Sequence, residues 1–104
     1  MSGGSPTPTP TPTPSCKDVR HAPISSPNPA AIASLKVGDR LDVVLAKSVG
    51  RAILQLQDFN GAVIGSLTFL GHLKLIECME MGFTYKAVVL SISGGAVQVR
   101  IEPT

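Results

Sequence analysis

A strict alternation of proline and threonine from Pro6 to Pro14 is the feature that most constrains this chain. Proline lacks a backbone N–H and has a fixed φ, so neither a helix interior nor a central sheet ladder can run through the repeat. Its preferred conformation is extended polyproline II, and further prolines follow up to Pro29. The sequence therefore predicts a disordered Pro/Thr/Ser-rich tail over residues 1–34 and a folded domain over residues 35–104.

Charge and hydropathy limit the classes of partner. Of the net charge of +2, one positive charge falls in residues 1–35 and one in the remainder. A domain that binds duplex DNA through its phosphates usually carries a concentrated basic face, so non-specific duplex binding is not expected. The chain has no run of about 18 apolar residues and no N-terminus of the secretory type. We expect a cytoplasmic protein with no membrane partner.

The cysteines and histidines do not predict a metal site. Two cysteines, Cys16 and Cys78, are too few for a disulfide scaffold, and we expect both to be reduced thiols. Together with His21 and His72 they supply the ligand types of a zinc site. However, His72 and Cys78 would project from a helix about 120° apart. No nucleophile with a base and no carboxylate pair can be recognised, so neither a cofactor nor an enzymatic activity is expected.

Period-two alternation of apolar residues predicts the first three strands. Residues 40–47 and 51–58 each place apolar side chains on one face, and a Ser-Val-Gly break separates them. The Asn60-Gly61 pair is a strong hairpin signal, and a third strand follows over residues 62–67. Gly65 within that strand indicates a bend or a close approach of another backbone.

The period then changes to that of a helix. Residues 69–81 are predicted to form an amphipathic helix with Thr68 as N-cap and Gly82 in the left-handed C′ position. Its apolar face would consist of residues that recur every third position: Leu70, Leu73 and Ile76. Two further strands, residues 83–92 and 97–101, are joined by a Ser-Gly-Gly turn.

Short hairpins on both sides of the helix imply antiparallel pairing. The expected order is strand, strand, strand, helix, strand, strand. A sheet of this size buries its core by curling, with the helix over one open end. The sequence therefore predicts a small α+β domain, an antiparallel five-stranded β-barrel or half-barrel with one helix.

Three segments resemble a known family. Val37–Leu41 looks like a "G-[DE]-x-L" strand start, and Asn60–Leu67 is similar to a "dG-x-x-iG-y-i" hairpin. Leu75–Val89 resembles a helix, a glycine and a "Y-x-A-x-V" strand. These are motifs of the HIRAN domain, a small β-barrel found alone in bacteria and fused to DNA-repair helicases in eukaryotes, and the resemblance covers residues 35–102. It implies a barrel that engages single-stranded nucleic acid or DNA ends.

A single-strand binding module would combine aromatic stacking platforms with a few cations. The candidate nucleic-acid-binding residues are the aromatic and basic side chains of the predicted strands and turns: Lys47, Arg51, Phe59, Tyr85, Lys86 and Arg100. Arg51 and Phe59 lie at opposite ends of one predicted strand. Tyr85 and Lys86 point to opposite faces of theirs, so a groove must recruit more than one strand.

A protein-interaction or self-assembly domain is the alternative function. The near-neutral charge of the predicted domain favours it over nucleic-acid binding. An exposed sheet edge or the helix flank would pair with a protein partner or with a second copy, and the Pro-Thr segment would act as a flexible linker.

Overall fold

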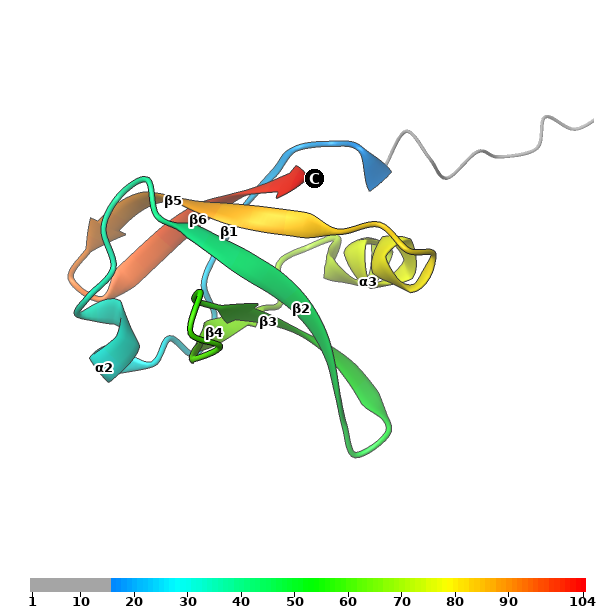
Figure 1. The fold of residues 1–104 in the computed structure, drawn as a ribbon, viewed down its shortest axis with the longest axis horizontal. Coiled ribbons are helices and arrows are strands. Elements are labelled where there is room, and N and C mark those ends of the chain that lie inside the picture. The colour runs from blue at the N-terminus through cyan, green and yellow to red at the C-terminus, as the bar shows by residue number, and fades with distance from the viewer. Residues whose placement is uncertain (1–15) are drawn as a thin grey trace, which may run out of the picture.

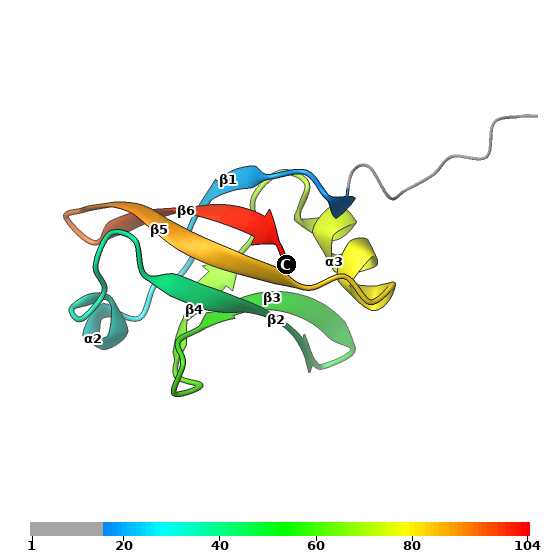
Figure 2. The ribbon, with the colours of Figure 1, turned by 45° about the horizontal axis from the view of Figure 1, so that its top comes forward.

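Six antiparallel strands form one curled sheet in the computed structural model, which describes residues 16–104. The sheet has the order β1-β6-β5-β2-β3-β4. The strands are β1 (Arg20–Pro23), β2 (Arg40–Ser48), β3 (Arg51–Gln57), β4 (Val63–Leu67), β5 (Tyr85–Ser93) and β6 (Ala96–Pro103). Helices α2 (Pro29–Ile32) and α3 (His72–Glu80) lie at opposite ends of the sheet (Figure 1 and Figure 2). The predicted small α+β half-barrel is confirmed, but it contains β1 and α2 in addition to the five strands and one helix predicted.

The predicted alternation explains which side chains of the sheet are buried. Leu41 and Val43 of β2 are buried, and Val43 lies opposite the buried Leu56 of β3. In the second hairpin, Val89 of β5 lies opposite Val99 of β6, and both are buried. Every second residue of these strands therefore faces one core on the inside of the curl.

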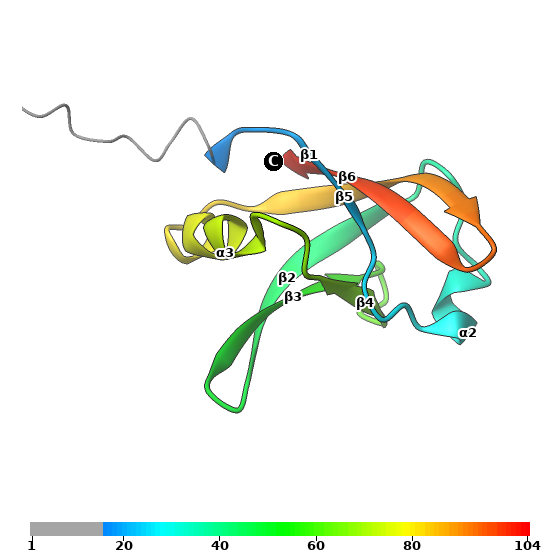
Figure 3. The ribbon, with the colours of Figure 1, turned by 180° about the vertical axis from the view of Figure 1, so that it is seen from behind.

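The segment before residue 35 closes the curled sheet. β1 pairs with β6 at one edge, and the chain then reaches β4 at the other edge, where Ser25 and Ser66 exchange backbone hydrogen bonds of 2.8 and 2.9 Å. Asn28 N–H donates to the Ile64 carbonyl at 2.8 Å. Figure 3 shows this connection running past β6 and β4 to α2. We call residues 16–28 the N-terminal strap.

The prediction that no strand or helix forms before residue 35 is therefore wrong for residues 16–34, and the reason is local. β1 is an edge strand with one neighbour, so it can accommodate Pro23, which has no N–H to donate. Pro29 begins α2, a position that needs no N–H donor, and the Asn28 side chain caps this helix by accepting from Ala30 N–H at 3.1 Å. The Pro-Thr repeat itself lies outside the described residues.

Gly65 of β4 is the point where the strap comes closest to the sheet. A Cβ atom there would lie 2.4 Å from Ile24 Cγ2 and 3.0 Å from the Ser25 carbonyl oxygen. Only a residue without a side chain permits this packing. The predicted close backbone approach at Gly65 is confirmed, and the strap is the segment that approaches.

Helix α3 is shorter than predicted and buries a different face. Gly71, at φ 99°, is its N-cap, and Thr68 instead hydrogen-bonds Ser25 through the two hydroxyl groups. The buried residues of α3 are Leu75, Ile76 and Cys78. The predicted face of Leu70, Leu73 and Ile76 is wrong except for Ile76, because Leu70 precedes the helix and Leu73 is exposed. Gly82, at φ 105°, follows the helix in the left-handed conformation predicted.

Cys16 and Cys78 form a disulfide, so the prediction of two reduced thiols is wrong. The bond joins the start of the strap to α3 across a sequence separation of 62 residues. Both cysteines are fully buried. Cys16 reaches α3 because the strap belongs to the fold, and the sequence prediction had placed Cys16 in a disordered tail.

Candidate functional site

A cavity of about 460 Å³ lies between α2, the segment that follows it and the turn from β3 to β4. Its lining includes the partly buried Leu35 and the buried Leu41 and Ile64. The polar part of the lining comes from Ser34, Asp39, Arg40, Asp58 and Asn60. The ten lining residues divide evenly between apolar and polar side chains, so the cavity is more polar than a typical small-molecule pocket and offers both contact surface and hydrogen-bonding groups.

The β3–β4 turn holds an aromatic ring at the border of this cavity. Asp58 Oδ1 accepts from the backbone N–H groups of Asn60 and Ala62, both at 2.9 Å, and thereby fixes the turn. Phe59 lines the cavity, yet 92% of its surface is exposed. The ring does not fold back into the core and remains accessible to a ligand.

Arg40 gives the cavity its cationic group. Asp39 Oδ2 accepts from Lys36 N–H at 2.9 Å, so this carboxylate is occupied in holding the turn before β2. Among residues 16–104 no carboxylate forms an ion pair with Arg40, whose side chain is exposed at the start of β2. Because no ion pair has to be broken first, the Arg40 guanidinium can donate hydrogen bonds to an anionic group of a ligand.

Lys47 and Arg51, two of the predicted site residues, lie far from this cavity. They flank the turn of the β2–β3 hairpin, which extends beyond the rest of the sheet (Figure 1 and Figure 3). Both side chains are exposed, and by strand alternation they project from opposite faces. Arg51 begins β3 whereas Phe59 follows its end, so about 20 Å of strand separates them.

Tyr85, the second predicted aromatic platform, belongs to the core. Only 2% of its surface is exposed, and its hydroxyl donates to the Cys16 carbonyl at 2.6 Å. Burial raises the pKa of the phenol, while the nearby Arg20 guanidinium acts in the opposite direction. Tyr85 therefore fixes the strap to β5 and cannot stack on a base.

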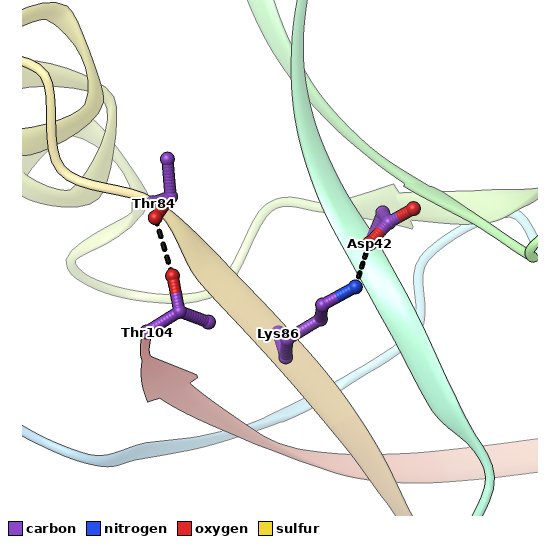
Figure 4. A network of polar contacts seen from close by, with 4 residues as sticks. All are labelled: Asp42, Thr84, Lys86 and Thr104. Carbon is purple, nitrogen blue, oxygen red and sulfur yellow. Dashed lines mark hydrogen bonds and ion pairs between the residues drawn. The ribbon is translucent and has the colours of Figure 1, made fainter.

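Lys86 and Arg100 lie on the outer face of the sheet, each with a carboxylate beside it. Lys86 pairs with Asp42 of β2 (Figure 4), and Arg100 Nε donates to Glu102 Oε2 at 2.5 Å. Figure 4 also shows the hydroxyls of Thr84 and Thr104 in contact at the start of β5. The expectation that Tyr85 and Lys86 face opposite sides is confirmed. The structure thus does not bring the six predicted residues together.

A second, apolar surface lies where the chain enters α3. Leu70 is fully exposed and 65% of Leu73 is exposed. Both line a shallow hollow with Phe69 and His72, whose ring Nδ1 lies 2.9 Å from the Phe69 carbonyl oxygen. Large apolar side chains side by side on a surface are typical of protein contacts.

Residues 16–104 contain neither a cluster of metal-ligating side chains nor a membrane-spanning helix. No three histidine, cysteine or acidic side chains gather there in a way that would hold a metal ion. No helix in the same range has the length and apolar character needed to cross a bilayer. Comparison of the chain with protein families, curated proteins and solved structures gives no match.

Sequence reasoning identified Phe59 but not Arg40 or the cavity. Phe59 directly precedes the Asn60-Gly61 hairpin signal, so the sequence predicts its position at a turn. The cavity could not be predicted from the sequence, because α2 supplies one of its walls and α2 lies within the predicted tail. The proline at the first position of α2, preceded by Asn28, was the available signal.

Proposed function

We propose that this chain is a non-catalytic binding module that takes single-stranded nucleic acid at the cavity between α2 and the β3–β4 turn. The observation that carries the proposal is the pairing of an exposed aromatic ring, Phe59, with an unpaired guanidinium, Arg40, at one cavity. Stacking of a base on the ring and contact of a phosphate with Arg40 are the interactions that single-strand binding sites use. The resemblance of residues 35–102 to a HIRAN domain supports the same substrate class.

The proposed binding has a limited electrostatic part. Lys86 and Arg100 are paired with Asp42 and Glu102, and Arg40 is the basic residue of the cavity lining, which also carries the carboxylates of Asp39 and Asp58. Each phosphate contact on a single strand contributes about −0.7 to the slope of log K against log salt. The salt dependence should therefore be shallow, as expected for a site that holds one or two nucleotides.

Fluorescence polarisation with short labelled single-stranded DNA tests the proposal. Phe59→Ala should weaken binding by about 5- to 150-fold, because stacking contributes about 1–3 kcal/mol per base. Arg40→Gln should weaken binding and flatten the salt dependence. Arg51→Gln, which removes another exposed cation at the tip of the β2–β3 hairpin, should have a much smaller effect. Equal losses for Arg40→Gln and Arg51→Gln would contradict binding at the cavity, and no saturable binding at all would end the proposal.

Self-association is the second candidate function, favoured by the exposed Leu70 and Leu73. Sedimentation equilibrium over a wide concentration range would detect it. If the apolar surface is a contact between copies, Leu70→Ser with Leu73→Ser should abolish any concentration-dependent rise in mass. A wild-type chain that stays monomeric at the highest concentration would exclude this candidate.

A further inference from the structure

We infer that the Cys16–Cys78 disulfide is a redox-controlled latch on the N-terminal strap, and that its reduction releases the strap from both edges of the sheet. The disulfide is the covalent connection between the start of the strap and α3. The Cα atoms of the two cysteines are 5.5 Å apart, and both residues are fully buried. Disulfides form and persist in oxidising surroundings and are rare in reducing ones, so the state of this bond can follow the environment.

Apart from the disulfide, the beginning of the strap is held by non-covalent contacts with β5 and β6, which include the interaction of Arg20 with Tyr85. The Tyr85 hydroxyl donates to the Cys16 carbonyl at 2.6 Å, and β1 pairs with β6 over only four residues. A short edge strand with one neighbour belongs to the low-stability end of a structure and opens before the core does. Without the disulfide, opening can proceed from Cys16 through β1 without breaking a covalent bond.

Opening of the strap would expose two sheet edges at once. Ile24 N–H donates to the Val97 carbonyl of β6 at 2.9 Å, and Ser25 forms its backbone pair with Ser66 of β4. When these bonds break, β4 and β6 both become edges, and the buried side chains of Ala22 and Ile24 leave the core. The half-barrel then loses the hydrogen bonds by which the strap joins its two ends.

The strap also supports one wall of the cavity. Ala31, Ser34 and Leu35 line the cavity and directly follow the strap, while Phe59 and Arg40 are carried by the sheet. Release of the strap removes that wall without moving the ring or the guanidinium. This consequence for ligand binding rests on the proposed function, whereas the release itself does not.

The redox step is a thiol–disulfide exchange with a dithiol. A thiolate of the dithiol attacks one cysteine sulfur and forms a mixed disulfide, and its second thiol then displaces that bond. The chain gains two electrons and two protons and carries two thiols, while the dithiol becomes a disulfide. Because both sulfurs are buried, attack requires a prior local opening, so the strap itself controls the rate of reduction.

Hydrogen exchange on the full chain, oxidised and then reduced with dithiothreitol, tests the latch. The strap amides of Ile24, Ser25 and Asn28 should exchange at least about tenfold faster after reduction, as should Ser66 opposite them. Amides of the β2–β3 hairpin will also lose some protection, because reduction lowers the stability of the whole fold, but in the reduced chain they should stay clearly more protected than the strap amides. Unchanged exchange of the strap amides would overturn the inference, and so would equal protection of the strap and the β2–β3 hairpin in the reduced chain.

Two variants separate the covalent bond from its surroundings. Cys16→Ser should show fast strap exchange whether or not reductant is present. Tyr85→Phe, which removes the hydrogen bond to the Cys16 carbonyl but keeps the disulfide, should show slow strap exchange until it is reduced. If Cys16→Ser does not fold, the reduced wild-type chain gives the same comparison.

Oligonucleotide binding, measured in parallel, distinguishes the latch from the proposed function. Binding that is lost on reduction and recovers on reoxidation supports both proposals. Strap release in a chain that never binds oligonucleotide leaves the latch standing and removes the function. Binding unaffected by a strap release that exchange does detect would overturn the link between strap and cavity.

Discussion

At the scale of single residues, the turn between β2 and β3 places a valine in a backbone conformation that favours glycine. Val49 has φ 50° and Gly50 has φ 76°, the two positive values that a type I′ turn requires. Glycine adopts this conformation at little cost, but a β-branched residue does not. Val49 is also fully exposed, so no burial of its side chain compensates for the backbone strain.

Val49→Asn should therefore stabilise the protein. Asparagine is the residue that most often precedes glycine in this turn, and a left-handed conformation costs an ordinary residue about 1–2 kcal/mol. We expect a gain of about 1 kcal/mol in the free energy of unfolding, measured by urea denaturation. Val49→Thr keeps the branched side chain and should give no gain. A stabilisation by threonine equal to that by asparagine would show that backbone strain is not the cause.

Tyr85 should make stability depend on pH in the alkaline range. Its pKa is raised above the ordinary value of 10.0, chiefly by burial. Between the pKa of the unfolded chain and the higher pKa of the folded one, the unfolded state has lost the phenolic proton and the folded state has kept it. Stability is thus fully present below about pH 10 and falls as pH rises toward the folded pKa.

The chain contains one tyrosine and no tryptophan, so the ultraviolet absorbance of the phenolate reports Tyr85 alone. The absorbance titration of the folded protein should have a midpoint above that of the denatured chain. Tyr85→Phe should remove this part of the alkaline loss of stability. A folded midpoint at or below the denatured one would contradict burial of the phenol.

At the scale of elements, the contact between β4 and the strap is the least tolerant of added volume. Gly65→Ala would place a Cβ within 2.4 Å of Ile24 Cγ2, so the strap or β4 must move. Overpacking of this kind costs roughly 1–3 kcal/mol, and a chemical denaturation series should show it. Ile24→Ala removes the clashing methyl group. Gly65→Ala should therefore cost less in that background than in the wild type, and equal costs would contradict the contact.

Elements whose pattern is local could be predicted from the sequence. The alternation in β2 and β3, the Asn60-Gly61 turn and the glycine after α3 each depend on a few adjacent residues, and each is present in the structure. β1 and α2 were missed because prolines near them suggest breaks, although an edge strand and a helix start both accept proline. The predicted face of α3 was wrong because it began at Leu70, which precedes the helix, whereas α3 begins at His72 and buries Leu75, Ile76 and Cys78.

At the scale of the whole molecule, the candidate site could be predicted only in part. Phe59 depends on a turn that the sequence encodes locally, whereas the cavity needs the strap, α2 and the β3–β4 turn to meet. Tyr85 was expected on the surface because nothing in its own strand indicates that Cys16 and Arg20 cover it. Long-range closure by residues 16–28 is therefore what a strand-by-strand interpretation could not supply.

The same closure sets the stability of the molecule as a whole. A core of this size alone supplies roughly 3–5 kcal/mol. A disulfide that restricts the unfolded chain across a separation of 62 residues adds about 4 kcal/mol in the loop-entropy account. The disulfide thus contributes about as much free energy of unfolding as the core does. The reduced chain keeps the contribution of the core and should still fold.

The Cys16→Ser, Cys78→Ser double variant should therefore lose about 4 kcal/mol of unfolding free energy and still unfold in one cooperative transition. Urea denaturation of the oxidised chain, the reduced chain and the double variant measures both points. The reduced chain and the double variant should agree, because each lacks the same restriction on the unfolded state. A difference below about 1 kcal/mol between oxidised and reduced chains would show that the cross-link does little for the fold. The absence of a cooperative transition in the reduced chain would show instead that the core alone cannot hold the sheet together.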